Sequence, residues 1–364
     1  MRIFVVIGTR PEAIKMLPLA MELKKSKHFD TKICFSGQHR ELARSVFEEF
    51  NIKADFVFDE IKKGRTLKEM TVHFIECFDR LFDKEKPELV LVHGDTATAF
   101  CGALASFYRG IDVAHIEAGL RSFDRLSPYP EEFMRVAIDA LSGVHFAPTE
   151  LSAENLRREG RQSVYTVGNT VIDALEYSLK KKCDLPILRE VGKRKLVLIT
   201  THRRENIGKR MKSSLAGIRD ILIKREDFFG IIPAHPNPEV QIAVRDAFDG
   251  VKNIKICEPF GVVEFHHLMK HAYAIFTDSG GIQEESAYLG IPVFLLRENT
   301  ERAECIASGN VRLVGCNGER IKEAFFAFLD DGNLQSRMRT PSVIFGDGHA
   351  SERIVNCLTS IMID

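Results

Sequence analysis

Short apolar runs alternate with amphipathic, helix-period segments along the whole chain. This alternation is typical of parallel strands that are joined by crossover helices. The first set of predicted strands covers residues 3–7, 32–36, 89–93, 113–116, 144–147 and 164–167. Residues 89–95, LVLVHGD, are apolar almost up to their polar end, as expected for a strand covered on both faces. The first half of the chain therefore predicts a parallel α/β sheet.

The alternation pauses near the middle of the chain and then starts again. A helix is predicted over residues 173–182, and residues 180–195, KKKCDLPILREVGKRK, are charged and show no clear period, which favours a linker. The second set of predicted strands covers residues 196–201, 230–234, 254–258, 274–277 and 292–296. We therefore predict two α/β domains, residues 1–172 and 173–345. Residues 346–364 predict a glycine-rich turn and an amphipathic helix that could pack on either sheet.

Composition narrows the class of protein. Two domains suit a chain of 364 residues, 45% of them apolar. The 51 Lys and Arg residues balance the 51 Asp and Glu residues, which argues against a nucleic-acid or anionic-membrane partner. No apolar run approaches the roughly 18 residues that span a bilayer, and the amino terminus lacks the features of a signal peptide. We therefore expect a cytoplasmic protein, whose eight scattered cysteines are free thiols.

The residues that follow each predicted strand are the candidates for chemistry, because open parallel sheets bind ligands beyond the carboxyl ends of their strands. After the first strand, the segment GTRPEAIK places Arg10 and Lys15 beside a helix start that contains Pro11. Backbone N–H groups and two cations there would bind an anion. An ordinary capped helix with solvated basic residues explains the pattern at least as well. Neither the dinucleotide motif nor the P-loop motif is present.

Carboxylates gather after the third and fourth predicted strands. Asp95 follows one strand, Glu117 follows the next, and Glu131 and Glu132 follow the turn SPYP. In a shared, partly desolvated cleft such acids would shift one another's pKa and divide acid and base work. A helix cap for Asp95 and helix-dipole partners for the glutamates are the structural alternatives. Three acids at the ends of adjacent elements favour catalysis.

The second half offers a phosphate-binding turn. Residues 201–208, THRRENIG, follow its first predicted strand, and Ser279, Gly280 and Gly281 follow its fourth. Small residues at a helix start allow a phosphate to approach the backbone closely, and a carboxylate four or five residues later would lie near a ribose. The dipeptide GG is also common in ordinary turns. His267 and His271 have i, i+4 spacing but no third ligand, so no metal site is predicted.

Taken together, the motifs resemble one family nearly end to end. They are, in order, GTRPEAIKM, GQHRE, HGDT, IEAGLRS, SPYPEE, VGNTVIDAL, THRRENIG, HPNP, TDSGGIQEE, TERAE and GDGHASERI. The chain is similar to the non-hydrolysing UDP-N-acetylglucosamine 2-epimerases. The resemblance implies the GT-B architecture, with two Rossmann-like domains whose parallel sheets face each other across a cleft. It also implies a sugar-binding first domain, a UDP-binding second domain, a helix in residues 346–364 that crosses back to the first domain, and a homodimer.

The resemblance assigns roles by motif. The catalytic residues that it implies are Asp95, Glu117, Glu131 and His202. The substrate and UDP contacts that it implies are Arg10, Lys15, Phe265, Ser279, Gly280, Gly281, Glu285 and Arg302, of which Phe265 and Arg302 rest on the resemblance alone. A second, allosteric UDP-GlcNAc site would use Gln38, Glu41, Arg203, Arg204 and His235. No cofactor and no metal are implied.

Two departures from the family pattern bear on these roles. Glu41 stands where some members have glutamine, so we expect allosteric activation to be retained but weaker. Glu132 is followed by Phe133-Met134-Arg135, where Asn-Arg is more usual, so the wall near Glu131 is expected to differ.

The implied reaction interconverts UDP-GlcNAc and UDP-ManNAc by elimination of UDP to a 2-acetamidoglucal and re-addition. It would supply N-acetylmannosamine units for bacterial-type surface polysaccharides. Three alternatives remain open: a hydrolysing epimerase that releases ManNAc and UDP, a GT-B glycosyltransferase, and a catalytically inactive nucleotide-sugar-binding protein. A glycosyltransferase would share the UDP half but would not need three acids in the first domain.

Overall fold

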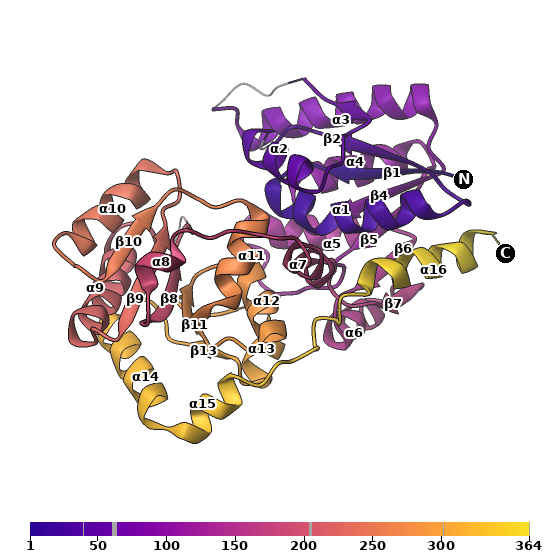
Figure 1. Cartoon of the computed structure of the whole chain (residues 1–364). Helices are drawn as coiled ribbons and strands as arrows, with labels where there is room; N and C mark the ends of the chain where they lie inside the picture. The colour runs from indigo at the N-terminus through magenta and orange to yellow at the C-terminus, as the bar shows by residue number, and fades with distance from the viewer. Residues whose placement is uncertain (39, 60–63, 204–205, 301, 364) are drawn as a thin grey trace. The chain divides into compact units, whose positions relative to one another are not determined.

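The computed structural model describes residues 1–38, 40–59, 64–203, 206–300 and 302–363, and Figure 1 shows its course. The chain divides into two compact units. The first consists of Met1–Tyr177 together with the chain from Phe345 onward, and the second consists of Ser178–Ile344. Each unit is built around its own parallel sheet, so each is described separately.

The first unit contains, within the described residues, a sheet of seven strands in the order β3-β2-β1-β4-β5-β6-β7. Its strands are β1 (Arg2–Ile7), β2 (Asp30–Phe35), β3 (Phe56–Val57), β4 (Leu89–His93), β5 (Asp112–Ile116), β6 (Val144–Ala147) and β7 (Val164–Thr166). Its helices are α1 (Arg10–Lys25), α2 (Arg40–Glu49), α3 (Leu67–Glu85), α4 (Ala97–Tyr108), α5 (Glu131–Leu141), α6 (Glu150–Arg158), α16 (Ala350–Ile363) and α7 (Thr170–Leu179), at whose end the second unit begins. The strand order proceeds outward from β1 to β3 and restarts at β4 on the other side of β1. The loops that follow β1 and β4 therefore meet at a topological switch point.

The second unit contains, in its described part, six parallel strands in the order β10-β9-β8-β11-β12-β13. They are β8 (Lys195–Thr200), β9 (Phe228–Pro233), β10 (Ile254–Cys257), β11 (Ala272–Thr277), β12 (Val293–Leu295) and β13 (Val311–Leu313). The helices are α8 (Leu188–Val191), α9 (Lys209–Lys224), α10 (Pro238–Phe248), α11 (Val262–Lys270), α12 (Gly281–Leu289), α13 (Ala303–Ala307), α14 (Gly318–Asp330) and α15 (Gly332–Met338). By the same reasoning, the switch point of this sheet lies at the carboxyl ends of β8 and β11.

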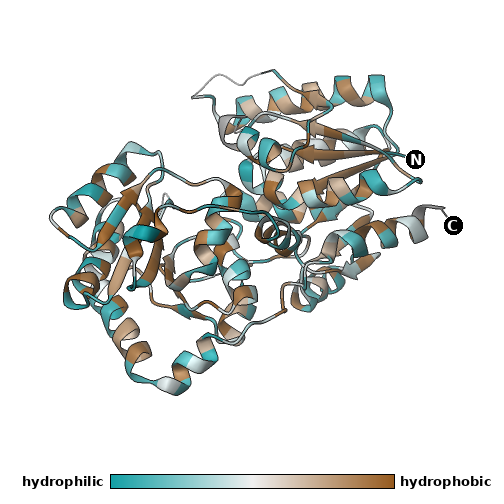
Figure 2. Ribbon diagram, in the orientation of Figure 1, coloured by the Kyte–Doolittle hydropathy of each residue, from teal (hydrophilic) through white to brown (hydrophobic). Residues whose placement is uncertain are grey.

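Apolar side chains fix both sheets in place. Figure 2 shows the hydrophobic colouring concentrated on the strands and on the inner faces of the helices. In the first unit Val6 of β1, Phe78 of α3 and Val92 of β4 share one buried cluster. In the second unit the rings of Phe276 and Phe294 stack with centroids 5.1 Å apart. Because buried side chains of this size each contribute roughly 1.5–3 kcal/mol, the strands form rigid supports for the loops at their ends.

The last helix completes the first unit. α16 packs against α1, and its first N–H groups are capped by the carboxylate of Asp173, which accepts from Ser351 N at 2.7 Å and from Ala350 N at 3.2 Å. A carboxylate at a helix amino terminus is favoured by the helix dipole.

The predicted fold class of two α/β domains with parallel sheets is confirmed. Each predicted strand overlaps an observed one. The edge strands β3 and β13 were not predicted, because β3 has only two residues and Arg312 separates the two apolar positions of β13. The charged stretch predicted as a linker contains the short helix α8. Among the described residues, no helix is both long enough and apolar enough to cross a membrane.

Candidate active site

A single buried carboxylate joins the two loops at the switch point of the first sheet. Glu12 of α1 accepts hydrogen bonds from Gly8 N at 3.0 Å, from Thr9 N at 2.7 Å and from Thr96 Oγ1 at 2.7 Å. The first two bonds belong to the loop after β1, and the third comes from the loop after β4. Burial raises the pKa of Glu12 to about 7, although these hydrogen bonds oppose the change. Glu12 thereby fixes the positions of the residues that follow both strands.

Glu117 is held in a buried polar cluster directly after β5. Its side chain accepts from Lys15 Nζ at 2.8 and 2.6 Å and from Asn169 Nδ2 at 3.3 Å, and His93 Nε2 lies 2.8 Å from its Oε2. The residue is only 7% exposed and adopts a φ of 64°. Such a backbone conformation is uncommon outside glycine and marks a position constrained by its surroundings. Burial lowers the pKa of His93 against the attraction of Glu117, which favours a neutral imidazole beside the carboxylate.

Asp95 is paired with an arginine of α5. Arg135 Nη2 contacts Asp95 Oδ2, and Arg135 Nη1 donates to Glu132 Oε2 at 3.1 Å. The other oxygen of Glu132 accepts from Ser122 N at 2.9 Å and from Phe123 N at 3.0 Å. The carboxylate of Glu132 thus holds the backbone of Ser122 and Phe123 in place. The side chain of Asp95, in contrast, is 28% exposed to solvent.

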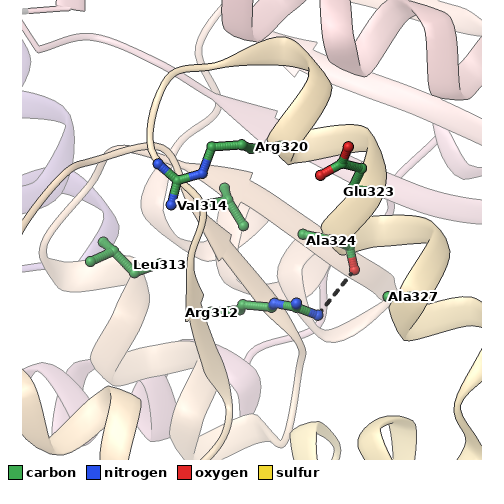
Figure 3. Close-up of a pocket in the computed structure, with 7 residues that line it drawn as sticks. All are labelled: Arg312, Leu313, Val314, Arg320, Glu323, Ala324 and Ala327. Atoms are coloured by element: carbon green, nitrogen blue, oxygen red, sulfur yellow. Dashed lines mark hydrogen bonds between the residues drawn. The ribbon is translucent and has the colours of Figure 1, made fainter.

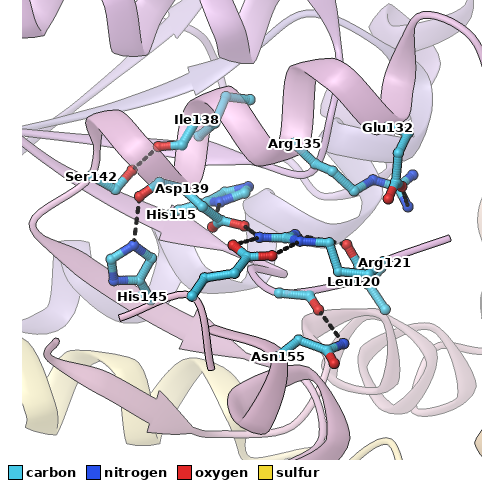
Figure 4. A network of polar contacts seen from close by, with 12 residues as sticks. His115, Leu120, Arg121, Glu132, Arg135, Ile138, Asp139, Ser142, His145 and Asn155 are labelled. Atoms are coloured by element: carbon cyan, nitrogen blue, oxygen red, sulfur yellow. Dashed lines mark hydrogen bonds and ion pairs between the residues drawn. The ribbon is translucent and has the colours of Figure 1, made fainter. Parts of the chain in front are cut away.

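A second polar network, centred on Asp139 and drawn in Figure 4 together with Glu132 and Arg135, contacts the turn after β4 through His115. His115 Nδ1 is 2.6 Å from Asp139 Oδ1, and His115 Nε2 is 2.8 Å from the carbonyl oxygen of Gly94. Arg121 contacts the other oxygen of Asp139 at 2.7 Å. Burial would raise the pKa of Asp139, but His115 and Arg121 hold it below its usual range. A charged, fully paired network of this kind gives the turn after β4 a single well-defined position.

The switch point of the second sheet is organised by the carboxylate of Asp278, at the end of β11. It accepts from Thr201 Oγ1 at 3.0 Å, from His202 N at 3.1 Å, from Arg203 N at 3.1 Å and from Asn206 Nδ2 at 3.1 Å. These donors all belong to the loop after β8. Although burial opposes it, hydrogen bonding and the charge of His202 lower the pKa of Asp278 to about 2. One buried charge therefore holds the two switch-point loops together.

Two histidines stand beside this carboxylate. His202 Nδ1 is 3.1 Å from Asp278 Oδ1, while 43% of the His202 side chain is exposed. The ring of His235 lies parallel to it at a centroid distance of 6.0 Å, and His235 Nδ1 accepts from Asn237 N at 3.2 Å. Burial, assisted by the charge of His202, lowers the pKa of His235. The exposed imidazole of His202 is oriented by a carboxylate and can donate to a ligand.

The turn at the start of α12 leaves room for an anion. A Cβ atom built on Gly281 would meet nothing within 4 Å, whereas one on Gly280 would lie 2.8 Å from Arg302 Nη1. Arg302 is buried and paired with Glu284. Glu285 is buried as well, and its Oε1 lies 3.1 Å from Nε2 of His266. A helix start with an open glycine and a nearby guanidinium has the composition of a phosphate-binding site.

The remaining predicted residues have the following positions. Glu131 and Arg10 are the first residues of α5 and α1, and Phe265 is half-buried on α11. Gln38 Oε1 accepts from Thr98 Oγ1 at 2.8 Å. Glu41 lies in α2, but its side chain is outside the description, as is the whole of Arg204. Gln38 and Glu41 belong to the first unit, and Arg203 and His235 belong to the second.

Sequence reasoning did not assign a site role to several residues that hold the predicted ones in place: Glu12, His93, Arg135, Asn169, His266 and Asp278. Two of them carried a usable signal, because His93 and Asp278 each end or directly follow a strand at a switch point. Glu12 also carried a local signal, because Thr9 and Glu12 have the spacing of a helix capping box. Arg135, Asn169 and His266 act through contacts that are distant in sequence, such as the 52 residues between Asn169 and Glu117. Such contacts cannot be found from local spacing.

Two hollows on the surface of the second unit are lined by other residues. Figure 3 shows one of about 280 Å³, lined by Arg312, Leu313, Val314, Arg320, Glu323, Ala324 and Ala327. None of these residues was predicted to act. Among the described residues, no cluster of three or more His, Cys, Asp or Glu side chains has a metal-binding arrangement. Each unit therefore carries its own set of candidate residues, near the switch point of its sheet.

Comparison with known proteins gives one consistent result. A family model described as UDP-N-acetylglucosamine 2-epimerase matches residues 21–359. The chain is 42% identical to the UDP-N-acetylglucosamine 2-epimerase of Bacillus subtilis, over 98% of this chain and 94% of that protein. It is similar to a crystal structure of UDP-GlcNAc 2-epimerase from Neisseria meningitidis bound to UDP-GlcNAc, with a TM-score of 0.94, 41% identity and coverage of 99% and 100%. It is also similar to the Methanocaldococcus jannaschii enzyme in complex with UDP-GlcNAc and UDP, with a TM-score of 0.86, 37% identity and coverage of 99% and 100%.

Proposed function

Because the chain belongs to the UDP-N-acetylglucosamine 2-epimerase family, we propose that it interconverts UDP-GlcNAc and UDP-ManNAc without net hydrolysis. The observation that carries this proposal is the buried cluster around Glu117, at a switch point where Asp95 supplies a second carboxylate. Inversion at C2 requires one group that removes a proton and another that delivers a proton to the opposite face. Two carboxylates in different surroundings meet that requirement.

The first half-reaction is an elimination. A carboxylate of the first unit takes the proton from C2, the electrons of the C–H bond form the C1–C2 double bond, and the C1–O bond breaks with its electron pair going to UDP. The products are a 2-acetamidoglucal and UDP. Since the proton at C2 is only weakly acidic, stabilisation of the departing diphosphate must provide much of the driving force.

The second half-reaction reverses these steps on the other face of the sugar. An acid delivers a proton to C2, and a diphosphate oxygen of UDP attacks C1, so the double bond is consumed and the C1–O bond is restored. The intermediate must not escape or react with water during this exchange. A hydrolysing enzyme would differ only here, because water rather than UDP would add to the sugar.

The two units would divide this work. In the first unit Asp95, Glu117 and Glu131 are the proposed catalytic acids, with Arg10 and Lys15 as substrate contacts. In the second unit the proposed diphosphate contacts are the N–H groups of the glycine turn together with His202 and Arg302. Glu285 is the proposed ribose contact, and Phe265 is proposed to lie beside uracil. These assignments rest on the family resemblance. Their support is that Asp95 follows β4, His202 follows β8 and the glycine turn follows β11.

The decisive experiment follows proton NMR of UDP-GlcNAc with the protein in deuterated water. We expect deuterium at C2 and the appearance of UDP-ManNAc. Free ManNAc with UDP would instead indicate the hydrolysing reaction, and the absence of both products would overturn the proposal.

Variants then test the residues. Glu117→Gln and Asp95→Asn should remain folded and lose about a hundredfold to ten-thousandfold in turnover, the typical contribution of a general acid or base. Glu154→Gln, an exposed change on α6, is the matched control and should leave turnover unchanged. Wild-type turnover in either of the first two variants would exclude that residue as a catalytic group.

The finer expectations from the family resemblance are part of the same proposal. We propose weak allosteric activation by UDP-GlcNAc through Gln38, Glu41, Arg203, Arg204 and His235. Full-rate conversion of UDP-ManNAc in the absence of added UDP-GlcNAc would contradict it. We also propose a homodimer in the cytoplasm that supplies N-acetylmannosamine units for surface polysaccharides. Light scattering that gives the 41.2 kDa mass of one chain would contradict the dimer.

A further inference from the structure

Asn169 contacts the buried carboxylate that the proposed reaction depends on, and nothing so far gives it a role. It lies in the loop between β7 and α7, is 2% exposed, and its Nδ2 donates to Glu117 Oε1 at 3.3 Å. Among the described residues, the titratable groups that contact Glu117 include Lys15 from α1 and His93 from the end of β4. Asn169 is an uncharged member of this cluster, and it approaches from a different element.

The orientation of the Asn169 amide is determined by the helix that follows it. Its Oδ1 accepts from Val171 N at 3.0 Å, in the first turn of α7. Because the oxygen is committed to capping the helix, the NH₂ group must be the one that faces Glu117. The amide therefore acts as a fixed donor to one oxygen of the carboxylate.

The returning carboxyl-terminal segment holds the Asn169 loop from behind. Asn169 N donates to the carbonyl oxygen of Phe345 at 2.6 Å. Gly168 and Gly346 pack backbone against backbone, and a Cβ atom on Gly168 would lie 3.0 Å from the Cα of Gly346. Their φ angles of 94° and 119° favour glycine. Asp173 anchors the same segment by capping α16. The chain from Phe345 to Ser351 is thus packed directly behind the proposed catalytic cluster.

We propose that Asn169 is a positioning residue for Glu117 and that the returning segment, residues 345–351, keeps Asn169 in its donating position. This inference rests on the proposed function, because it concerns the acid/base work of Glu117. It gives the end of the chain a part in catalysis in addition to its part in folding. A carboxylate that exchanges protons needs one fixed orientation. The Asn169 donor on Oε1 helps to hold the orientation in which Lys15 and His93 contact Oε2.

The first test replaces the donor by a carboxylate of the same shape. Asn169→Asp retains an oxygen that caps α7 but places a second negative charge against Glu117. Two carboxylates in contact share a proton. In a plot of kcat/KM against pH, the acidic limb should therefore move to higher pH by at least one unit, and kcat at pH 7 should fall at least tenfold. Asn317→Asp makes the same change at the cap of α14, where Asn317 accepts from Glu319 N and Arg320 N, and should leave the profile unchanged.

A second variant covers the case in which Asn169→Asp does not fold. Asn169→Ser keeps a capping hydroxyl and removes the amide donor. It should lower kcat at least fivefold while UDP affinity changes less than twofold. Unchanged kcat in Asn169→Ser, or an unmoved acidic limb in folded Asn169→Asp, would overturn the positioning role. If the wild-type protein itself shows no exchange at C2, the proposed function falls, and this inference falls with it.

The returning segment is tested by two alanine substitutions. A Cβ atom on Gly346 would lie 3.3 Å from Asn169 N, whereas one on Gly348, whose φ is also positive, would lie 3.0 Å from the Glu176 side chain. Gly346→Ala should lower kcat severalfold and Gly348→Ala should not. In the Asn169→Ser background, Gly346→Ala should cause no further loss, because its effect passes through Asn169. Equal losses in both glycine variants, or additive losses in the double variant, would overturn the role of the segment.

Discussion

The two units share one architecture but use it differently at their switch points. In the first unit ionisable side chains are buried against one another, as Glu117 is against Lys15 and His93. In the second unit the buried carboxylate of Asp278 is surrounded by neutral N–H and O–H donors and the ring of His202, and the turn beside it exposes its own backbone at Gly281.

The difference matches two kinds of task. Proton transfer needs titratable groups in a desolvated place, where neighbours can tune them. Holding an anion needs fixed dipoles that remain where they are whether or not the ligand is present. Changes in the first unit should therefore act on turnover and on pH dependence, and changes in the second unit should act on affinity.

The largest predicted effect is a loss of stability when the buried ion pair Lys15–Glu117 of the first unit is broken. Lys15→Met removes the cation and leaves Glu117 charged and desolvated, which should lower the free energy of unfolding by about 3–5 kcal/mol. Chemical denaturation at pH 7 measures this. The exposed pair Arg44–Glu48 is the control, since Arg44→Met should cost no more than about 1 kcal/mol. A Lys15→Met, Glu117→Gln double variant should recover part of the lost free energy of unfolding. Equal losses in Lys15→Met and Arg44→Met would contradict the difference between the buried and the exposed pair.

The second prediction concerns pH. The pKa of Glu12 rises from 4.5 to about 7 on folding, so between these values the folded chain retains a proton that the unfolded chain has released. The free energy of unfolding should therefore fall as pH rises through this window, by about 3 kcal/mol from this residue. Glu12→Gln should abolish that slope, as denaturation curves at pH 4.5, 5.5 and 7 would show.

An exposed copy of the same motif provides the control for Glu12. Glu69 forms an identical capping box with Thr66 at the start of α3, and hydrogen bonds from Thr66 lower its pKa. A lowered carboxyl pKa contributes stability that is present at higher pH and lost on acidification. Glu69→Gln should thus change the pH dependence with the opposite sign. The same sign in both variants would mean that burial does not control Glu12.

The third prediction moves to the second unit. Asp278 has a folded pKa of about 2 against a usual 3.8, so its contribution, about 2 kcal/mol, is fully present above pH 4 and lost as the pH falls through 2. Asp278→Asn should lower the free energy of unfolding at pH 7 by about this amount and weaken UDP binding. Asp220→Asn, at a partly exposed pair, is the control and should change both little. Retained UDP affinity in a folded Asp278→Asn variant would show that the two loops do not depend on this carboxylate.

Sequence patterns predicted the regular part of this fold well, and physical reasons explain what they missed. Strands buried on both faces, such as β4, give long apolar runs that cannot be mistaken for loops. β3 has only two residues, and in β13 Arg312 separates two apolar positions. Neither segment has the continuous apolar run that predicted β12, which is as short as β13.

For the site, the sequence indicated which residues end the strands but not how they are held. Asp95 and Glu117 were identified because each follows a strand. Their partners Arg135 and Asn169 come from elements 40 and 52 residues away, and only the tertiary structure brings them together. Glu132 illustrates the converse, since it was considered with the catalytic acids but its carboxylate braces the backbone of Ser122 and Phe123.

The smallest predicted effect separates stability from affinity most sharply. Gly281 is the first residue of α12 and has open space where a Cβ atom would stand, so Gly281→Ala should leave the fold intact or stabilise it by up to about 1 kcal/mol, because alanine favours a helix. The same methyl group would block a phosphate from the backbone N–H groups, so calorimetric UDP affinity should fall about tenfold, or about 1.4 kcal/mol. Gly332 begins α15 with equally open space, and Gly332→Ala should match the stability effect without the loss of affinity.

At saturating substrate the turnover of Gly281→Ala should stay within a few fold of wild type, because the acids of the first unit are untouched. If UDP affinity is unchanged in Gly281→Ala, no phosphate approaches this turn; if turnover falls instead of affinity, the division of labour between the two switch points is wrong.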